Sequence, residues 1–375
     1  MTDAVVVGGG PAGAALATRL AIAGRAVVVL ERDAGPVDKV CGEFLSTEAM
    51  RDVADLGLDL RALGAVPIES VRLFARGKEA SARLPFAACS LSRRVLDEAL
   101  LARASAAGAE VRRGTLVRAL EPEGRRWTAR LDDGRRVSGD TCFLATGKHD
   151  IQALRRSRGW QRDLIAFKMH FCLVPREQSA LARTVEIALF EGGYAGLQPV
   201  EGGRANLCLV VRRARLSLLG RTWERVLSSL CQESPHLAAR LDGATPCWSR
   251  PLALSAIPYG HVQRRSEGIW RLGDQAAVIP SFVGDGMSIA LHSAELAASM
   301  YLARRSADAY QRALARDVSG QMVLATMVSQ GLVRGLTQRA IGFILDRWPE
   351  LLARVASSTR IPESALARSS RGHPS

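Results

Sequence analysis

The sequence predicts an α/β protein that combines a Rossmann-type fold with an inserted, largely antiparallel β-sheet domain and a helical C-terminal region. Three observations support this fold class. The first 32 residues read as a strand, a glycine-rich turn, a helix and a second strand. Residues 166–260 carry alternating strand and turn signals, with one helix near residues 223–230. Beyond residue 307, apolar residues recur at helical spacing.

The glycine-rich turn predicts a dinucleotide site. Its residues are Gly8, Gly9, Gly10, Pro11, Ala12 and Gly13. Gly8 permits a tight turn after the strand, Gly10 lets the backbone approach a pyrophosphate, and Gly13 lets the helix pack closely on the sheet. The helix that follows points its partially positive N-terminus at the phosphates.

The second strand ends in Glu31 and Arg32, about 20 residues after the turn. A carboxylate at this place is positioned to accept a hydrogen bond from a ribose 2′-hydroxyl, and it repels a 2′-phosphate. The unit therefore favours adenosine without a 2′-phosphate, as in FAD or NAD.

The order of the elements predicts a discontinuous organisation. Strand signals at residues 68–86 interrupt the first domain, which resumes with the strand that ends at Gly273 and Asp274. We assign residues 1–67, 87–160 and 263–306 to the nucleotide-binding domain, 68–86 and 161–262 to a substrate domain, 307–360 to C-terminal helices and 361–375 to a disordered tail.

Length and composition restrict the class of protein. The chain of 375 residues is long enough for a large core and more than one structural unit. Charged residues interrupt every apolar segment and the first strand begins at once, which predicts no membrane-spanning helix and no signal peptide. We therefore expect a cytoplasmic protein, with a peripheral position at the inner face of the membrane as an alternative. The sequence leaves its oligomeric state unknown.

The net charge and the potential metal-ligating residues limit the kinds of partner and metal ion that we expect this protein to bind. A solvated surface is the simplest explanation of the net charge of +14, and the alternative is an anionic partner such as a membrane, a carrier protein or an acidic substrate. Nucleic acid is disfavoured, because only 5% of the residues are aromatic. The six histidines form no paired ligand motif, and the seven scattered cysteines indicate reduced, mostly buried thiols, so no metal is expected.

A second motif lies near residue 280. Asp274, after Gly273 at a strand end, can hydrogen-bond a ribityl hydroxyl. The loop after it leads into a helix N-terminus, an arrangement that can stabilise negative charge on a reduced flavin. The loop contributes Pro280, Gly284, Asp285, Gly286 and Met287 as candidate cofactor-binding residues.

These motifs, with Arg93 four residues before Asp97, resemble the FAD-binding pattern of the para-hydroxybenzoate-hydroxylase-like flavoproteins over residues 1–305. The resemblance implies FAD as the cofactor, held by the residues of both motifs and by Arg93, and NAD(P)H as the electron donor. One departure concerns that donor, because Thr146 stands where the aromatic hydroxylases have an aspartate. The following Lys148 and His149 either supply charge near the cofactor or form a solvated turn.

Within this superfamily, the sequence is similar to the geranylgeranyl-reductase-like branch. Cys41 and Gly42 match the Cys-Gly of that branch, and the resemblance implies that both residues contact the cofactor. The segment 194–199 matches its Tyr-x-Trp-x-Phe-Pro element, except that glycine and glutamine replace the tryptophan and the phenylalanine. This replacement widens the expected cavity, and it disfavours halogenation because halogenases have two tryptophans there. The resemblance implies Tyr194, Gly196, Gln198 and Pro199 as substrate-binding residues, and Cys41 and Tyr194 as catalytic candidates.

The sequence supports three functions. The resemblance implies the first two, and only the excess of arginine supports the third, an FAD-binding scaffold or a carrier-docking protein. The first is a monooxygenase that hydroxylates an aromatic, polyketide or lipid-like substrate with NAD(P)H and O₂ through a flavin C4a-hydroperoxide. The second is a reductase of prenyl or other lipid double bonds, in which Cys41 assists protonation; the alternative for Cys41 is a buried loop thiol. The third is a non-catalytic FAD-binding scaffold.

Overall fold

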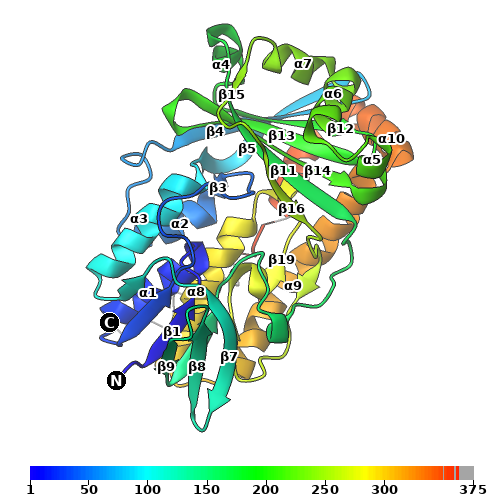
Figure 1. The fold of residues 1–375 in the computed structure, drawn as a ribbon. Helices are drawn as coiled ribbons and strands as arrows, with labels where there is room; N and C mark the ends of the chain where they lie inside the picture. Colours follow the sequence, from blue (N-terminus) through cyan, green and yellow to red (C-terminus); the bar gives the residue numbers. More distant parts are fainter. Residues whose placement is uncertain (349, 359, 363–375) are drawn as a thin grey trace.

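The computed structural model describes residues 1–348, 350–358 and 360–362, which form two domains, one above the other (Figure 1). The predicted disordered tail, apart from residues 361–362, lies outside the described residues. The lower domain is built on a five-stranded parallel sheet, and the upper one on a nine-stranded sheet. The predicted fold class is confirmed.

The parallel sheet has helices on one face and a small sheet on the other. Its strand order is β18-β10-β1-β2-β6. Along β1, Ala4 and Val6 face the helical layer, whereas Val5 and Val7 pack on the small sheet, as the two-residue period of a strand requires. The strands are β1 (Ala4–Val7), β2 (Val27–Leu30), β6 (Glu110–Arg112), β10 (Thr141–Leu144) and β18 (Trp270–Arg271); the helices include α1 (Pro11–Ile22), α3 (Arg93–Ala106) and α8 (Gly286–Leu302); the small sheet has β7 (Val117–Glu123), β8 (Arg126–Leu131) and β9 (Arg136–Gly139).

The upper sheet has the order β15-β11-β14-β13-β12-β4-β5-β3, with β16 also paired to β11. Its strands pair antiparallel, except that β12 runs parallel to β4. It draws on more of the chain than residues 68–86 and 161–262, because β3 belongs to it and β5 continues to Ser90. The strands are β3 (Phe44–Ser46), β4 (Val66–Ala75), β5 (Lys78–Ser90), β11 (Leu164–Cys172), β12 (Thr184–Phe190), β13 (Gly193–Val200), β14 (Arg204–Arg212), β15 (Thr245–Pro246) and β16 (Leu252–Ser255).

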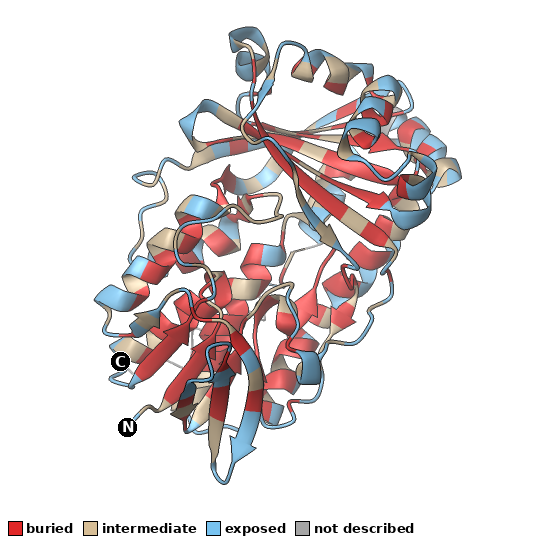
Figure 2. Cartoon of the chain, viewed as in Figure 1, coloured by how far each residue is buried: buried red, intermediate tan, exposed pale blue. Residues whose placement is uncertain are grey.

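Helices cover both faces of the upper sheet, and Figure 2 shows that its strands are largely buried. The expectation of one helix within this domain was wrong, since four short helices are present. Two of them begin with a proline at the first turn, a start signal that the strand pattern concealed. They are α4 (Pro175–Leu181), α5 (Arg213–Leu218), α6 (Trp223–Glu233) and α7 (Pro235–Leu241); the C-terminal region forms α9 (Ala307–Leu332), α10 (Gly335–Arg347) and α11 (Glu350–Ser358).

Two further expectations from the sequence concern membrane-spanning helices and the burial of the cysteines. Among the described residues, no helix combines the length and the apolarity needed to cross a membrane. The cysteines are all free thiols, but the expectation that most are buried was wrong: Cys89 and Cys142 are buried, Cys172 is exposed, and the other four are half-buried.

Candidate active site

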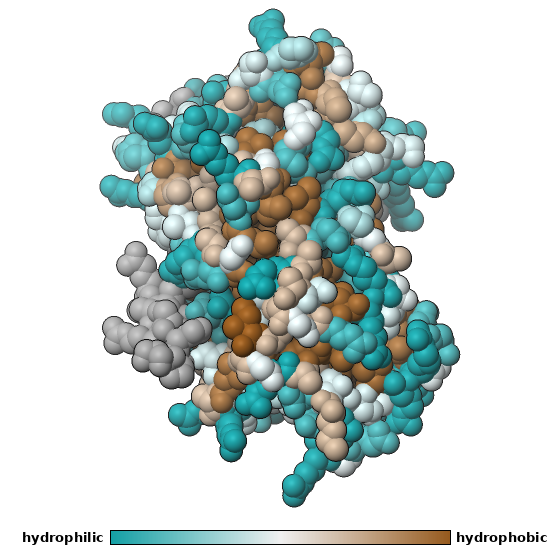
Figure 3. Space-filling model, turned by 90° about the vertical axis from the view of Figure 1, so that its left-hand side faces the viewer, coloured by the Kyte–Doolittle hydropathy of each residue, from teal (hydrophilic) through white to brown (hydrophobic). Residues whose placement is uncertain are grey.

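One cavity of about 550 Å³ extends from the parallel sheet to the upper sheet. It starts at Glu31, passes Gly10 and Arg93, reaches Asp274, and ends among apolar side chains of the upper sheet and Leu352 of α11. On the face drawn in Figure 3, apolar side chains gather in a band at the waist between the two domains. The cavity thus joins a polar part and an apolar part.

The glycine turn shapes the polar end. Gly8 has φ +104°, and a Cβ on Gly13 would lie 1.9 Å from the Gly8 carbonyl oxygen, so both positions need glycine for the fold itself. A Cβ on Gly10 would instead approach Arg93 Nη2 at 3.3 Å, within the cavity. Gly10 therefore leaves room for a ligand rather than for packing.

Glu31 lies where the sequence places a ribose contact. Its Oε2 accepts a hydrogen bond from the Gly9 N–H at 2.6 Å, and its Oε1 accepts one from the Asp33 N–H at 3.0 Å. The carboxylate is buried and lines the cavity. It holds the turn in shape and presents negative charge at this end of the cavity.

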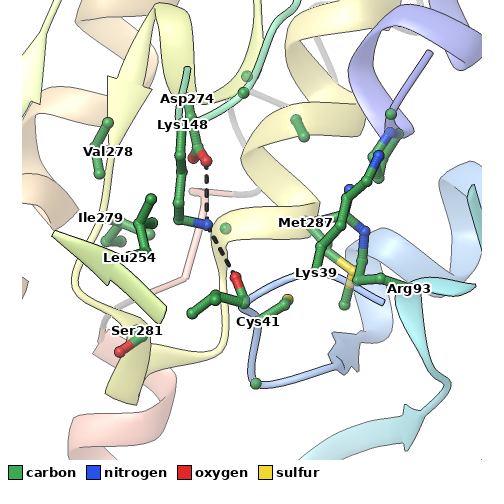
Figure 4. A pocket seen from close by; sticks show the side chains of 18 of the residues that line it. Lys39, Cys41, Arg93, Lys148, Leu254, Asp274, Val278, Ile279, Ser281 and Met287 are labelled. Carbon is green, nitrogen blue, oxygen red and sulfur yellow. Dashed lines mark hydrogen bonds and ion pairs between the residues drawn. The ribbon is translucent and has the colours of Figure 1, made fainter. Parts of the chain in front are cut away.

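A half-buried ion pair lies where the two parts of the cavity meet. Lys148 Nζ lies 3.3 Å from Asp274 Oδ2 and 3.5 Å from the Val40 carbonyl oxygen (Figure 4). Arg156 donates hydrogen bonds to the main-chain oxygens of Asp274 and Lys148 at 3.0 and 2.9 Å. Burial would raise the pKa of Asp274, but Lys148 and Arg156 hold it below its usual range. Of the two alternatives for the 148–149 turn, Lys148 supplies charge to the cavity.

The loop that carries Cys41 and Gly42 is fastened to the upper sheet. Glu43 has a left-handed φ of 62°, and its side chain is fully buried. Lys168 Nζ donates to Glu43 Oε1, and His170 Nε2 lies 2.8 Å from Glu43 Oε2. Burial alone would raise the pKa of Glu43, but the hydrogen bonds and charges of these two residues lower it below its ordinary value.

Further hydrogen bonds hold the same loop. Asn206 Nδ2 donates to the carbonyl oxygens of Cys41 and Gly42 at 3.1 and 2.9 Å. Lys168 also donates to the Lys39 carbonyl oxygen at 3.1 Å. We call Glu43, Lys168, His170 and Asn206 the loop clamp. It fixes the backbone of residues 39–43 beside Arg93, whose own N–H donates to Glu43 Oε1 at 2.8 Å.

Two residues of the loop clamp, Glu43 and His170, form a group with metal-ligand geometry together with Asp38. The ammonium of Lys168 bonds to Glu43 and lies 3.9 Å from Asp38 Oδ1. Lys168 therefore already supplies the positive charge that a metal ion would bring, and the cluster is better explained as an ion-pair network.

Three hydroxyl groups line the apolar part of the cavity. Tyr259 donates to Ser281 Oγ at 2.9 Å, and the Tyr194 hydroxyl lies 3.0 Å from the same oxygen. Burial raises the pKa of Tyr194 to about 12, so its hydroxyl keeps its proton at neutral pH. Nearby, a Cβ on Gly196 would meet only the Cys208 carbonyl oxygen, at 3.8 Å, among the described atoms. The wall at Gly196 is therefore open.

The cavity brings together most of the residues singled out from the sequence. Four of them do not line it: Gly13 packs under the turn, Pro199 accepts a hydrogen bond from Ser90, Pro280 is buried outside the cavity, and Asp285 pairs with Arg360 at 3.1 Å. The residues that line it are Gly8, Gly10, Pro11, Ala12, Glu31, Arg32, Cys41, Gly42, Arg93, Tyr194, Gly196, Gln198, Gly273, Asp274, Gly284, Gly286 and Met287.

Sequence reasoning missed the loop clamp, Arg156, and the Tyr259–Ser281 pair. One signal was available: Lys168 and His170 alternate with apolar residues on a strand that is buried on both faces. Charged or polar groups at such positions need partners. The partners themselves were not visible, because Glu43 lies more than a hundred residues away along the chain.

Comparisons with known proteins agree with this geometry. A family model described as an FAD binding domain matches residues 1–141. Menaquinone reductase of Mycobacterium tuberculosis is 27% identical over 316 residues, which cover 80% of this chain and 76% of the relative. Digeranylgeranylglycerophospholipid reductase 2 of Methanopyrus kandleri is 30% identical over 318 residues, covering 77% and 74%.

A solved structure of the halogenase PltM in complex with phloroglucinol and FAD superposes with a TM-score of 0.74. The alignment covers 99% of this chain and 90% of the halogenase, at 14% sequence identity. At this identity the likeness shows the fold alone.

Proposed function

This chain belongs to the family of FAD-dependent oxidoreductases that includes the geranylgeranyl reductases, and from that premise we propose that it reduces carbon–carbon double bonds of an isoprenoid or similar apolar lipid. The observation that carries the proposal is the continuity of the cavity, in which a dinucleotide-shaped polar end opens into an apolar end that contains buried hydroxyl groups. This chain aligns with menaquinone reductase and with digeranylgeranylglycerophospholipid reductase 2 along most of the length of each. The names of these two relatives support the same substrate class.

The residues present fit FAD. The space at Gly10 suits a pyrophosphate, Glu31 suits the adenosine ribose, and Asp274 suits the ribityl chain. The Lys148 ammonium adds positive charge beside that chain. When bound, FAD would supply the hydride that adds to one carbon of the double bond.

Tyr194 is the residue best placed to supply the proton that completes the reduction. If Tyr259 donates to Ser281 and Ser281 donates to the Tyr194 oxygen, the Tyr194 proton is free to point into the cavity. Its raised pKa keeps that proton in place until a strongly basic carbon develops. Cys41 also lines the cavity and is the alternative donor.

The apolar wall positions the substrate. Side chains such as Val71, Ile187, Leu254 and Ile257 surround the inner part of the cavity and exclude water. A prenyl chain gains affinity from this burial without any polar contact. The prenyl chain is therefore the part of the substrate that this site would recognise.

An anaerobic assay tests the proposal. The protein, loaded with FAD and reduced by dithionite under nitrogen, is mixed with a geranylgeranyl-bearing glycerolipid or with a menaquinone. Mass spectrometry should show the gain of two hydrogen atoms per reduced double bond. Unchanged substrate together with a flavin that stays reduced would contradict the proposal.

Hydroxylation of an aromatic lipid is a second candidate, favoured by the open wall at Gly196. A planar ring needs more width than a prenyl chain, and the absence of a side chain there provides it. In this reading O₂ is a substrate, and product from isotope-labelled O₂ carries the label. Phenolic lipids tested under air and under nitrogen therefore separate the two functions.

NAD(P)H as the electron donor is part of both proposals. The assay with dithionite bypasses it, so it needs its own measurement. Stopped-flow mixing with NADH and with NADPH should bleach the oxidised flavin spectrum, and failure of both to do so would point to a different donor.

A further inference from the structure

Large exposed apolar side chains concentrate on the C-terminal helices. On α10, Leu336 is 83% and Phe343 69% exposed, and on α9 Met327 is 63% exposed. Scattered apolar residues are normal on a protein surface, but a cluster on consecutive helices is not. We define the C-terminal patch as Val323, Leu324, Met327, Leu336, Phe343, Ile344 and Trp348.

The patch has the pattern of an amphipathic helix that lies on a surface. In α10, Leu336, Ala340, Phe343 and Arg347 follow one another at intervals of four, three and four residues, so they share one exposed face. The opposite face, with Gly342, rests against Ala75 of the upper sheet. The apolar residues of the exposed face, Leu336, Ala340 and Phe343, are therefore directed away from the sheet.

Four exposed arginines belong to the same part of the chain as the patch. Arg334 directly precedes α10, Arg339 and Arg347 lie on α10, and Arg354 lies on α11. The Arg347 guanidinium lies over the Trp348 ring, 5.9 Å from its centroid. Apolar side chains flanked by arginines match the interface of an anionic bilayer, where phosphates meet acyl chains.

The C-terminal region also borders the cavity. Leu352 and Val355 of α11 line its apolar end, and α9 and α10, which precede α11 in the chain, lie on the right-hand side of the molecule in Figure 1. We propose that the C-terminal patch docks the protein on a bilayer that contains anionic phospholipid, so that a lipid substrate passes from the bilayer to the cavity beside α11. The substrate part of this inference rests on the proposed function, whereas the docking part does not.

A second copy of the chain is a poorer occupant of the patch. A twofold interface would set patch against patch and bring the arginines of both copies together. Like charges across an interface weaken association. An anionic surface removes that repulsion instead of creating it.

Vesicle co-sedimentation tests the docking, with neither substrate nor electron donor present. The FAD-loaded protein is mixed with vesicles of phosphatidylcholine, with and without phosphatidylglycerol. Binding should require phosphatidylglycerol and should weaken as salt is raised. Arg339→Glu should lower the affinity by about fivefold or more, because each arginine near an anionic surface adds about that factor.

The apolar contribution is tested by Phe343→Glu and Leu336→Glu, each at an exposed position where the fold tolerates charge. Both should reduce vesicle binding by about tenfold or more. The matched control is Ile22→Glu, which changes another exposed apolar residue, 62% exposed at the end of α1, and should bind as the parent protein does.

Three outcomes would overturn the inference: no binding to either vesicle, equal binding by the patch variants and the parent, or a dimer in solution that the patch variants dissociate. Turnover of substrate dispersed in detergent reports on the proposed function separately. A protein that is active in detergent but does not bind vesicles would refute the docking and keep the function.

Discussion

Glu43 and His170 lie 127 positions apart in the sequence, yet Glu43 Oε2 and His170 Nε2 are 2.8 Å apart in the buried interior. The contact joins a loop of the cofactor site to strand β11 of the upper sheet. Lys168, on the same strand, pairs with the other oxygen of the same carboxylate. The Glu43 side chain thus connects the loop that carries Cys41 and Gly42 to the upper sheet, so the position of this loop depends on both domains.

Replacing Glu43 should therefore weaken both the fold and FAD binding. In Glu43→Gln, Lys168 stays buried and keeps only the more distant Asp38, at 3.9 Å, as a counter-charge. We expect a loss of about 3 kcal/mol in the free energy of unfolding. Urea unfolding and FAD titration measure the two effects. The control is Glu69→Gln, which breaks an exposed pair with Arg183 and should cost less than about 1 kcal/mol. Similar losses in both variants would argue against the clamp.

The glycines of the turn should separate into two classes. Gly10→Ala should fold normally but lose most of its FAD affinity, because its Cβ occupies the space expected for the pyrophosphate. Gly13→Ala should be unstable with or without FAD, because its Cβ would lie 1.9 Å from the Gly8 oxygen. Thermal melting of the apoproteins and flavin content after loading distinguish them. A Gly10→Ala protein with normal flavin content would refute this reading of the site.

Tyr194→Phe tests the proton donor. The variant keeps the ring and its packing, so FAD affinity and KM should stay close to those of the parent. The rate of double-bond reduction in a single turnover should fall by about 100-fold or more, the usual contribution of a general acid. Tyr301→Phe, at a tyrosine outside the cavity, serves as the control. An unchanged rate would assign the proton to Cys41 or to water, and Cys41→Ser would then separate those two.

The pH dependence of stability should contain a contribution from Asp52. Burial, together with the charge of the nearby Glu295, raises the pKa of Asp52 to about 7. The folded protein then binds this proton more tightly than the unfolded chain does, so stability is lost as pH rises from about 4 to about 7. Asp52→Asn should resemble the parent near pH 4 and should be more stable above pH 7, by up to about 4 kcal/mol.

Urea unfolding at several pH values measures this difference. Asp55→Asn is the matched control, since Asp55 lies on the same helix as Asp52, α2 (Thr47–Asp55), but is exposed. The expectation fails if Asp52→Asn follows the parent at every pH. A parallel gain in both variants would instead reflect the net charge of the helix.

Local patterns in the sequence were sufficient for the parts of the site that local structure builds. The turn from Gly8 to Gly13 and the loop at Gly284 were visible because each is one continuous segment with its own backbone requirements. The C-terminal helices could also be predicted, because the helical spacing of their apolar residues is a local pattern in the sequence.

The remaining features depend on contacts between distant segments. The clamp at Glu43 needs β11 and β14, and the contribution of β3 to the upper sheet needs its pairing with β5. Neither the spacing nor the composition of Phe44–Ser46 distinguishes that strand from a loop. Patterns in a single sequence indicate which residues need a partner, whereas the tertiary fold determines which residue that partner is.

The strand order β18-β10-β1-β2-β6 also has a consequence for how this protein is made. Its first strand begins at residue 4 and its last ends at residue 271. At ordinary rates of translation the nascent chain waits roughly 15 to 50 s for that last strand. Until then the edge of β10 stays open, and such contacts between distant segments form slowly. A fragment that ends before Trp270 therefore leaves the parallel sheet without β18, and the unpaired edge of β10 is then open to pairing with another chain.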